Sequence, residues 1–153
     1  MQIPHGITIR GYTGAETVEV VTARNEAGNI PAWDTYPAKS EYFMPLTVKK
    51  SGLSLQTLKF CVKGYVPGTM RIVLRQYSFD TALADVFVDI IRGLNDVTAN
   101  MGSIELKKNV EYQLYMAASN NFYPPSIKSE WVVENEYLDI QHGSAYYNGD
   151  TTL

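Results

Sequence analysis

Cysteine and histidine are scarce in this sequence. The 153 residues include one cysteine, Cys61, and two histidines, His5 and His142. A single cysteine cannot form an intrachain disulfide, and so few side chains of this kind leave little material for a structural zinc site. Hydrophobic residues make up 45% of the chain, which is enough for one domain with its own core. We therefore expect a single domain with no metal and no other cofactor.

Long apolar runs and basic clusters are also missing. No stretch approaches the ~20 apolar residues of a membrane-spanning helix, and residues 1–6 lack the basic and then apolar layout of a signal peptide. The net charge is -3 and no Lys/Arg cluster occurs, whereas nucleic-acid binding usually needs a basic stripe. We expect neither a membrane nor a nucleic acid as a partner.

The charge is unevenly spread along the chain. Residues 1–78 carry nine Lys/Arg against five Asp/Glu, a balance of +4, and residues 79–153 carry four against eleven, a balance of -7. One interpretation is that strands from the two halves interleave, so that no dipolar surface survives. The other is a positive patch that meets a negative patch on a neighbouring copy.

From residue 41 onward the pattern is that of β-strands. Residues 55–63 alternate with Leu58, Phe60 and Val62 on one face, and residues 69–77 alternate with Ile72 and Leu74 facing inward. With a short turn between them, the two segments predict a hairpin. Seven residues are expected in the core: Leu58, Phe60, Val62, Ile72, Leu74, Tyr112 and Leu114.

Further short strands complete an all-β chain. The patterns predict strands at residues 7–10, 17–23, 41–48, 86–91, 103–106, 110–117, 127–133, 137–140 and 145–147. Pro45 suits an edge strand or a bulge, and residues 92–102, rich in Asn, Asp and Gly, read as a loop. Such spacing is typical of a sandwich or barrel.

Residues 24–40 show no periodic element and contain Pro31 and Pro37. We interpret this stretch as an extended arm or a long loop, a kind of segment that is often functional. Residues 1–40 then form N-terminal strands and the arm, and residues 41–153 form an antiparallel β-sandwich.

The order of motifs between residues 41 and 149 resembles that of jelly-roll modules. The motifs are Glu-Tyr-Phe-Met-Pro-Leu at 41–46, Leu-Ser-Leu-Gln-Thr-Leu at 53–58, Pro-Gly-Thr at 67–69, the strand at 70–76, Leu-Lys-Lys-Asn-Val-Glu-Tyr-Gln-Leu at 106–114 and Gly-Ser-Ala-Tyr-Tyr-Asn-Gly at 143–149. Modules of this kind occur in phage virion proteins, as decoration, tail or fibre components, and in extracellular carbohydrate-binding modules. The resemblance implies a jelly-roll sandwich and one of these two roles.

Catalytic and metal sites have little support in the sequence. Glycoside hydrolysis needs two carboxyl groups across a cleft, and candidates are Asp80, Asp85, Asp89, Glu130, Glu134, Glu136 and Asp139. Acidic residues in turns and on outward strand faces are the ordinary alternative. Calcium could use oxygen donors at Asp80, Asp85, Asn95, Asp96 and Asn100, but no calcium-loop spacing appears. No GxSxG elbow accompanies the histidines, and Cys61 reads as an inert, covered thiol. We therefore expect that the protein is not an enzyme and that it has neither catalytic residues nor metal ligands.

Aromatic residues are plentiful, with eleven Tyr, five Phe and two Trp. Exposed Tyr and Trp mark protein interfaces or sugar-stacking platforms. As interface residues we predict Trp33, Tyr36, Phe122 and Tyr123, and as glycan-binding residues in the alternative we predict Tyr65, Tyr146 and Tyr147. Trp33 is the expected anchor of the arm.

These observations predict a non-enzymatic structural protein of a virion, such as a phage capsid decoration (cement) protein or a tail or fibre component. Its partners would be other virion proteins and copies of itself, in a homo-oligomer for which a trimer is the expectation. The alternative is an extracellular or virion-borne carbohydrate-binding module that attaches to cell-surface glycan.

Overall fold

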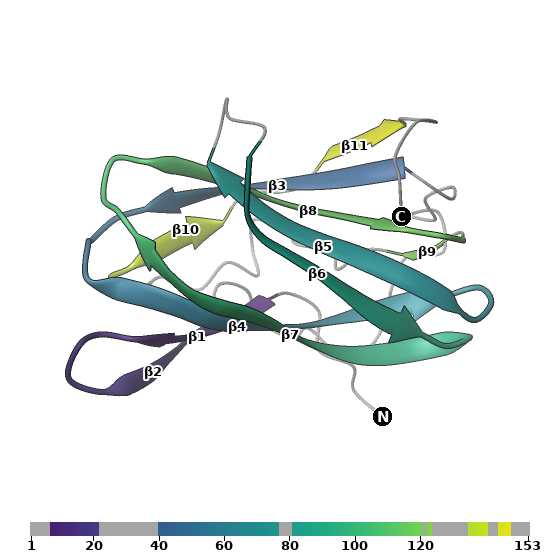
Figure 1. Cartoon of the computed structure of the whole chain (residues 1–153), viewed down its shortest axis with the longest axis horizontal. Helices are drawn as coiled ribbons and strands as arrows, with labels where there is room; N and C mark the ends of the chain where they lie inside the picture. The colour runs from purple at the N-terminus through teal and green to yellow at the C-terminus, as the bar shows by residue number, and fades with distance from the viewer. Residues whose placement is uncertain are drawn as a thin grey trace.

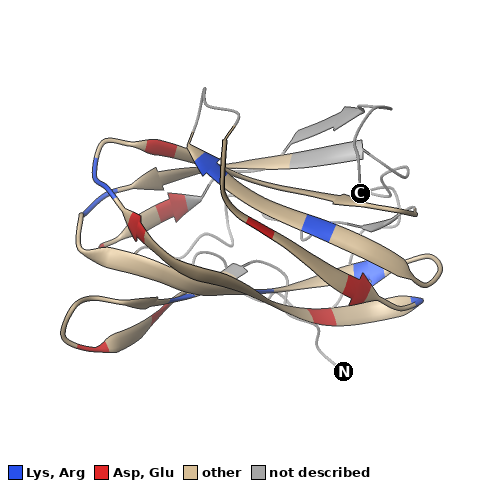
Figure 2. Cartoon of the chain, in the orientation of Figure 1, with Lys and Arg blue, Asp and Glu red and all other residues tan. Residues whose placement is uncertain are grey.

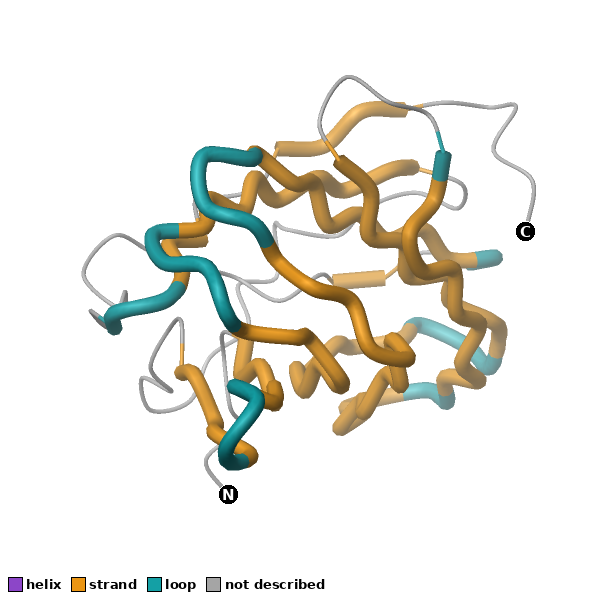
Figure 3. Tube along the Cα trace, turned by 60° about the vertical axis from the view of Figure 1, so that its left-hand side comes forward, coloured by secondary structure: helices purple, strands orange, loops and turns teal. Residues whose placement is uncertain are grey.

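The protein is all-β in the part of the chain that the computed structural model describes, which comprises residues 7–21, 40–76, 81–120, 122–123, 135–140 and 144–147. Two antiparallel sheets face each other as a β-sandwich (Figures 1 and 3). No helix occurs in these ranges, and hence none that could cross a membrane.

Each sheet is built from strands that are distant in sequence. The five-stranded sheet has the order β2 (Thr17–Val21), β1 (Ile7–Tyr12), β4 (Leu53–Gly64) and β7 (Gly93–Leu106), with β9 (Phe122–Tyr123) paired to the end of β4. The six-stranded sheet has the order β10 (Leu138–Ile140), β3 (Ser40–Val48), β8 (Glu111–Ala118), β5 (Gly68–Gln76) and β6 (Ala82–Ile90), with β11 (Ser144–Tyr147) paired to β3.

The core lies between the inner faces of the two sheets. All seven residues predicted to be buried are confirmed, since none exposes more than 3% of its surface. Alternation with period two put them on one face of each strand, and that face meets the other sheet. The strands predicted at 7–10, 103–106 and 145–147 lie within β1, β7 and β11, and those predicted at 17–23, 110–117 and 137–140 overlap β2, β8 and β10. Residues 22 and 23 lie outside the described residues, and Val110 and Tyr137 each precede the observed strand. The predicted strand at 127–133 and the arm at 24–39 lie outside the described residues, and Ser40 begins β3.

The predicted hairpin between residues 55–63 and 69–77 is wrong. β4 pairs with β1 and β7, whereas β5 pairs with β6 and β8 in the other sheet. Residues 65–67 therefore carry the chain across the sandwich. The physical reason is that alternation identifies which face of a strand is buried but not which strand lies beside it. Two strands in opposite sheets that share one core show the same alternation as the two strands of a hairpin.

The loop predicted at residues 92–102 is also wrong, because β7 runs without interruption from Gly93 to Leu106. Its inward positions include Val97, Ala99 and Met101, which are buried, and the alternate positions are polar and exposed. Pairing with β4 at residues 94–100 and 104–106 outweighs the weak strand propensity of Asn, Asp and Gly. The strand predicted at 86–91 begins earlier, at Ala82.

β3 is not an edge strand, so one of the two contexts predicted for Pro45 is wrong. On one side it pairs with β8, where Pro45 faces Gln113. On the other side, described pairing with β10 ends at Leu46 and pairing with β11 begins at Phe43. Pro45, which has no N–H group to donate, thus lies between the part of β3 that pairs with β10 and the part that pairs with β11.

The two halves of the chain interleave, as one interpretation of the charge pattern predicted. β8 lies between β3 and β5, and β7 lies beside β4. Basic and acidic residues are accordingly mixed over the described strands (Figure 2). The opposite charges of the two halves do not separate into two sides of this part of the molecule.

Candidate functional site

Three connections meet at one end of the sandwich, on the right in Figure 1. They are residues 65–67 between β4 and β5, Ile91 and Arg92 between β6 and β7, and Ser119 with Asn120 after β8. We call this the loop end. The opposite end carries the turn from β7 to β8, at Lys107–Asn109.

Gly64 allows the first two connections to touch. It forms a parallel bridge with Arg92, and a Cβ atom at this position would lie 2.5 Å from the carbonyl oxygen of Ile91. Only glycine permits so close an approach of two backbones. The end of β4 and the β6–β7 connection are thereby held together.

Asn95 fastens the β6–β7 connection from within β7. Its Oδ1 accepts a hydrogen bond from the Ile91 N–H (2.8 Å), and its Nδ2 donates to the carbonyls of Ile91 (2.9 Å) and Gly93 (3.1 Å). The side chain satisfies backbone groups that no strand pairs. Asn95, a candidate calcium ligand, is thus committed to the backbone.

The β8 end holds the β4–β5 connection in a similar way. The Thr69 N–H donates to Ser119 Oγ and the Ser119 N–H donates to the Thr69 carbonyl, both at 2.9 Å. Asn120 Nδ2 donates to the Pro67 carbonyl at 3.1 Å. These bonds fix the backbone on which Tyr65 and Val66 stand.

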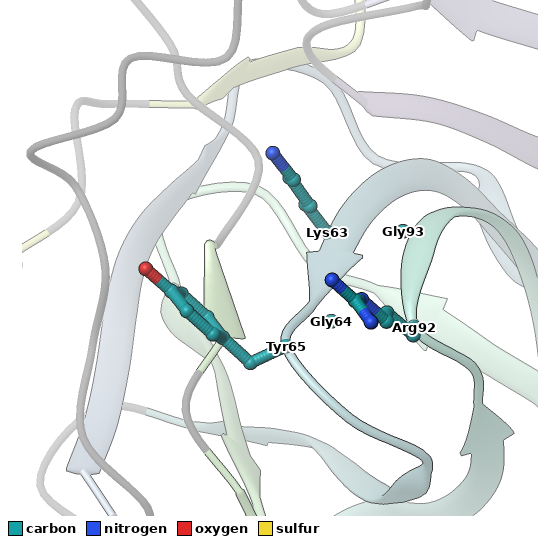
Figure 4. A pocket seen from close by; sticks show the side chains of 5 residues that line it. All are labelled: Lys63, Gly64, Tyr65, Arg92 and Gly93. Carbon is teal, nitrogen blue, oxygen red and sulfur yellow. The ribbon is translucent and has the colours of Figure 1, made fainter.

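A cleft of about 340 Å³ opens at the loop end. It is lined by Lys63, Gly64, Tyr65, Arg92 and Gly93, and we call it the tip cleft (Figure 4). Lys63 and Tyr65 rise from either side of Gly64, and Arg92 comes from the neighbouring connection. Two cationic side chains and one aromatic ring therefore share a small hollow, which suits an anionic group next to an apolar surface.

Exposed apolar side chains surround the tip cleft. Tyr65, Val66, Ile91 and Leu94 are between 43 and 63% exposed. Leu94 pairs in register with Lys63 across β7 and β4, and a Cβ atom on Gly64 would lie 3.6 Å from the Val66 carbonyl oxygen. Of the seven large hydrophobic residues exposed in the described ranges, these four gather at one end. We call these four residues the apolar rim.

The structure brings several predicted site residues to this end. Tyr65 lines the cleft. β9, formed by Phe122 and Tyr123, pairs with Gly64 and Lys63. β11, which contains Tyr146 and Tyr147, pairs with the first residues of β3, at the same end of the six-stranded sheet. Trp33 and Tyr36 lie outside the described residues.

Sequence reasoning missed the other members of the site. Val66, Ile91 and Leu94 were not singled out, nor were Lys63 and Arg92 as cleft residues. The sequence Ile91-Arg92-Gly93-Leu94 does contain a signal for this site. Connections between strands are normally polar, and here two large apolar residues flank one.

A second cluster covers the outer face of the six-stranded sheet. The Arg75 guanidinium lies 4.9 Å from the ring centroid of Tyr115 and 5.5 Å from that of Phe43, and Arg75 Nε donates to Gln113 Oε1 at 3.2 Å. The two rings lie 5.6 Å apart. Offset aromatic and cation–π contacts of this kind stabilise a sheet surface.

Arg71 extends this outer face toward β6. Its Nε and Nη2 donate to the two oxygens of Asp85 at 2.8 and 2.6 Å, and its guanidinium lies 5.7 Å from the Phe87 ring centroid. The hydrogen bonds from Arg71 lower the pKa of Asp85 below its usual value of 3.8. Asp85, once a candidate acid and calcium ligand, is held as an ion-paired carboxylate.

The remaining candidates for chemistry are scattered. Glu136 pairs with Lys50 at 3.2 Å, while Asp89 and Asp139 are exposed on different strands. Asp80, Glu130, Glu134 and both histidines lie outside the described residues. Within the ranges described, no group of three or more His, Cys, Asp or Glu residues could hold a metal ion.

Cys61 is buried in β4. Burial, with a smaller contribution from Asp96, raises the pKa of its thiol to about 11. Because the thiolate is the nucleophile, such a thiol is unreactive at neutral pH.

No protein-family model matches the sequence, and no curated protein matches it either.

Proposed function

We propose that this chain is a non-enzymatic structural protein of a virion, a phage capsid decoration protein or a tail or fibre component, and that its loop end binds a neighbouring subunit. The observation that carries the proposal is the apolar rim, four exposed apolar side chains of which three lie on the hydrogen-bonded connections and one, Leu94, lies at the start of β7. Exposed apolar side chains that gather at one end of a domain mark an interaction surface. Burying such apolar surface in an interface stabilises the complex by about 25 cal/mol per Å².

A jelly-roll topology, as in the virion modules that the sequence resembles, is part of the proposal. Strand pairing in the two sheets is nested, with β3 beside β8, β4 beside β7 and β5 beside β6. A long antiparallel hairpin rolled up on itself has this nesting, and double-sheet jelly rolls are built in that way. The nested pairs support the jelly-roll assignment over other sandwiches.

Rigidity of the loop end favours assembly over catalysis. The three connections are tied to each other by backbone contacts and by the side chains of Asn95, Ser119 and Asn120. An interface that is already ordered loses little conformational entropy when it binds. The partners would be another virion protein and copies of this chain.

A second candidate function, glycan attachment, is favoured by the tip cleft. Lys63, Arg92 and Tyr65 all line it, and an aromatic side chain near two cations fits a sugar that carries a carboxylate or sulfate group. The module would then attach to a host surface, on a virion or outside the cell.

The two functions are separable by mutation. In the assembly test, Ile91→Glu with Leu94→Glu is compared with Tyr12→Glu, an exposed apolar residue on β1, for incorporation into purified virus particles, measured by quantitative mass spectrometry. We expect the rim variant to be lost from the particles and the control to be retained at a fixed stoichiometry.

In the glycan test, Arg92→Gln with Lys63→Gln is compared with Lys108→Gln, at the opposite end, on arrays of neutral, sialylated and sulfated glycans. Binding of acidic glycans that is lost only in the cleft variant, with incorporation of the rim variant unchanged, would favour the attachment module. Absence of the wild-type chain from all particles would refute the virion role.

A further inference from the structure

β6 is an edge of the six-stranded sheet, and it differs from the other edges of the described strands. β2, β10 and β11 have five, three and four residues, and the outer positions of β7 are mostly polar. β6 has nine residues and contains no proline, lysine or arginine. Natural sheets protect their edges by short length, proline or lysine. β6 has none of these three protections; its charged residues are two aspartates, and its pairing with β5 has one register shift, between Leu74 and Arg75.

The side chains of β6 are incompletely covered on both faces. On the outer face Leu83 is 45% and Phe87 52% exposed. On the inner face Ala84, Val86 and Val88 are only half-buried, although Met70, Ile72 and Leu74 on the adjacent β5 are fully buried. One more strand beside β6 would cover both sets, because side chains of neighbouring strands contact each other on each face.

We propose that the occupant of this edge is β6 of a second copy, added antiparallel about a two-fold axis through Val86. A two-fold axis perpendicular to the sheet places the inner face of one copy beside the inner face of the other. A residue whose side chain points inward must therefore pair with another inward-pointing residue, and this restricts the possible registers. With Val86 on the axis, Ala82 faces Ile90 of the second copy and the nine residues of β6 overlap from end to end, including the irregularity at Leu83, where the pairing with β5 shifts register. This is the register of maximal overlap.

Like-charge repulsion excludes the two neighbouring registers. With Val86 on the axis, Asp85 faces Phe87 of the second copy and Asp89 faces Leu83, so no two carboxylates are opposed. An axis at Phe87 would oppose Asp85 to Asp89 twice, and an axis at Asp85 would oppose that residue to its own copy. Like charges directly opposite each other destabilise a strand pair.

The ion pair on β5 and β6 supports this arrangement. Arg71 is in register with Phe87 on β5 and β6, and its guanidinium already contacts Phe87 and Asp85 of its own chain. Asp85 of the second copy would extend the row beyond Phe87, so that one aromatic ring separates the Arg71 cation from a second carboxylate. Each copy contributes the same row, as an isologous interface requires.

The dimer does not depend on the proposed function, because the apolar rim lies at the loop end and not along the edge of β6. The Ile91→Glu, Leu94→Glu variant should leave dimerisation unchanged. Failure of one proposal therefore does not imply failure of the other.

Cysteine crosslinking tests the register. Residues directly opposite in an antiparallel pair have Cα atoms ~4.5–5.5 Å apart, within the range of a disulfide. Single Val86→Cys, Asp85→Cys and Phe87→Cys variants of the full chain are oxidised with copper phenanthroline, with Tyr12→Cys as the off-edge control. We expect Val86→Cys to give at least about tenfold more covalent dimer than the other three variants. Cys61 is buried and adds little background.

Sedimentation equilibrium tests the association itself. We expect the wild-type protein to reach twice its monomer mass of 17.1 kDa. Phe87→Asp places one new carboxylate opposite Asp85 of the other copy in each half of the interface, and it should raise the dissociation constant about tenfold or more, whereas Tyr12→Asp should not. A monomer or trimer at high concentration, or a crosslinking maximum away from residue 86, would overturn the proposal.

Discussion

At the scale of single residues, the described side chains divide by what surrounds them. Phe60 and Val62 are sealed between the sheets. On the outer face of the six-stranded sheet, Arg71 and Arg75 lie against aromatic rings and are hydrogen-bonded to Asp85 and Gln113. The core side chains stabilise the fold by burial, whereas the two arginines stabilise the outer face by packing on aromatic rings and by hydrogen bonds.

Replacing Phe60 by Ala should lower the free energy of unfolding by ~3–5 kcal/mol, because it removes a large buried ring and leaves a cavity. The matched control, Tyr12→Ala on the neighbouring strand β1, removes a 43% exposed ring and should cost about 1 kcal/mol or less. Urea denaturation measures both. Equal losses in the two variants would contradict the assigned core.

Asp85→Asn should destabilise the protein at neutral pH and lose this effect in acid. The pKa of Asp85 is lowered in the folded state by Arg71, so the ionised carboxylate stabilises the fold above the unfolded value of 3.8. That stabilisation falls as the pH drops through the lower, folded pKa. Because the pair is partly exposed, we expect no more than about 1 kcal/mol at pH 7.

The pH dependence is measured by urea denaturation of the wild type and of Asp85→Asn between pH 7 and pH 2, at low protein concentration. The difference in unfolding free energy between the two should shrink toward zero in acid. A difference that is constant with pH would mean that Arg71 does not stabilise the charged form of Asp85.

At the scale of elements, the connections decide what the strands present to solvent. Gly64 brings the end of β4 against the β6–β7 connection. Asn95, near the start of the long strand β7, satisfies the backbone of Ile91 and Gly93. The rim and cleft residues that lie on connections owe their fixed positions to these contacts, whereas Lys63 and Leu94 are placed by the pairing of β4 with β7.

Asn95→Ala should therefore loosen the loop end before it unfolds the sandwich. We expect a loss of about 1–2 kcal/mol and faster hydrogen exchange at the Ile91 amide, which loses its acceptor. The control is Asn100→Ala, on the same strand, whose Oδ1 accepts only from the Gly102 N–H in the described contacts (3.0 Å). Unchanged exchange at Ile91 in the Asn95 variant would show that its side chain does not hold the connection.

At the scale of the whole molecule, no contiguous half of the chain forms a sheet alone. β8 lies between β3 and β5, and β7 covers one side of β4. Each layer contains strands from both halves, so the core forms only when distant segments meet. Such a chain is one cooperative unit.

Residues 1–78 expressed alone should therefore be unfolded, since they lack β6, β7 and β8. Circular dichroism and a thermal scan check this, with the full chain as the control. A cooperative melting transition of the fragment would show that the N-terminal half is an independent domain.

The sequence by itself determined the all-β class and the seven core residues, because period-two alternation and burial are local properties of a strand. It also favoured a single interleaved domain over two separated charge patches. The partner of each strand was decided only by the tertiary structure. β4 and β5 alternate as a hairpin would but belong to different sheets, and β7 forms from a loop-like composition because ten of its residues, 94–100 and 104–106, pair with β4. The candidate site was likewise visible only in part. Tyr65 stood out as an aromatic residue in a turn, whereas Arg92 and Ile91 join it through a close approach of two backbones at Gly64, which depends on how distant strands pair.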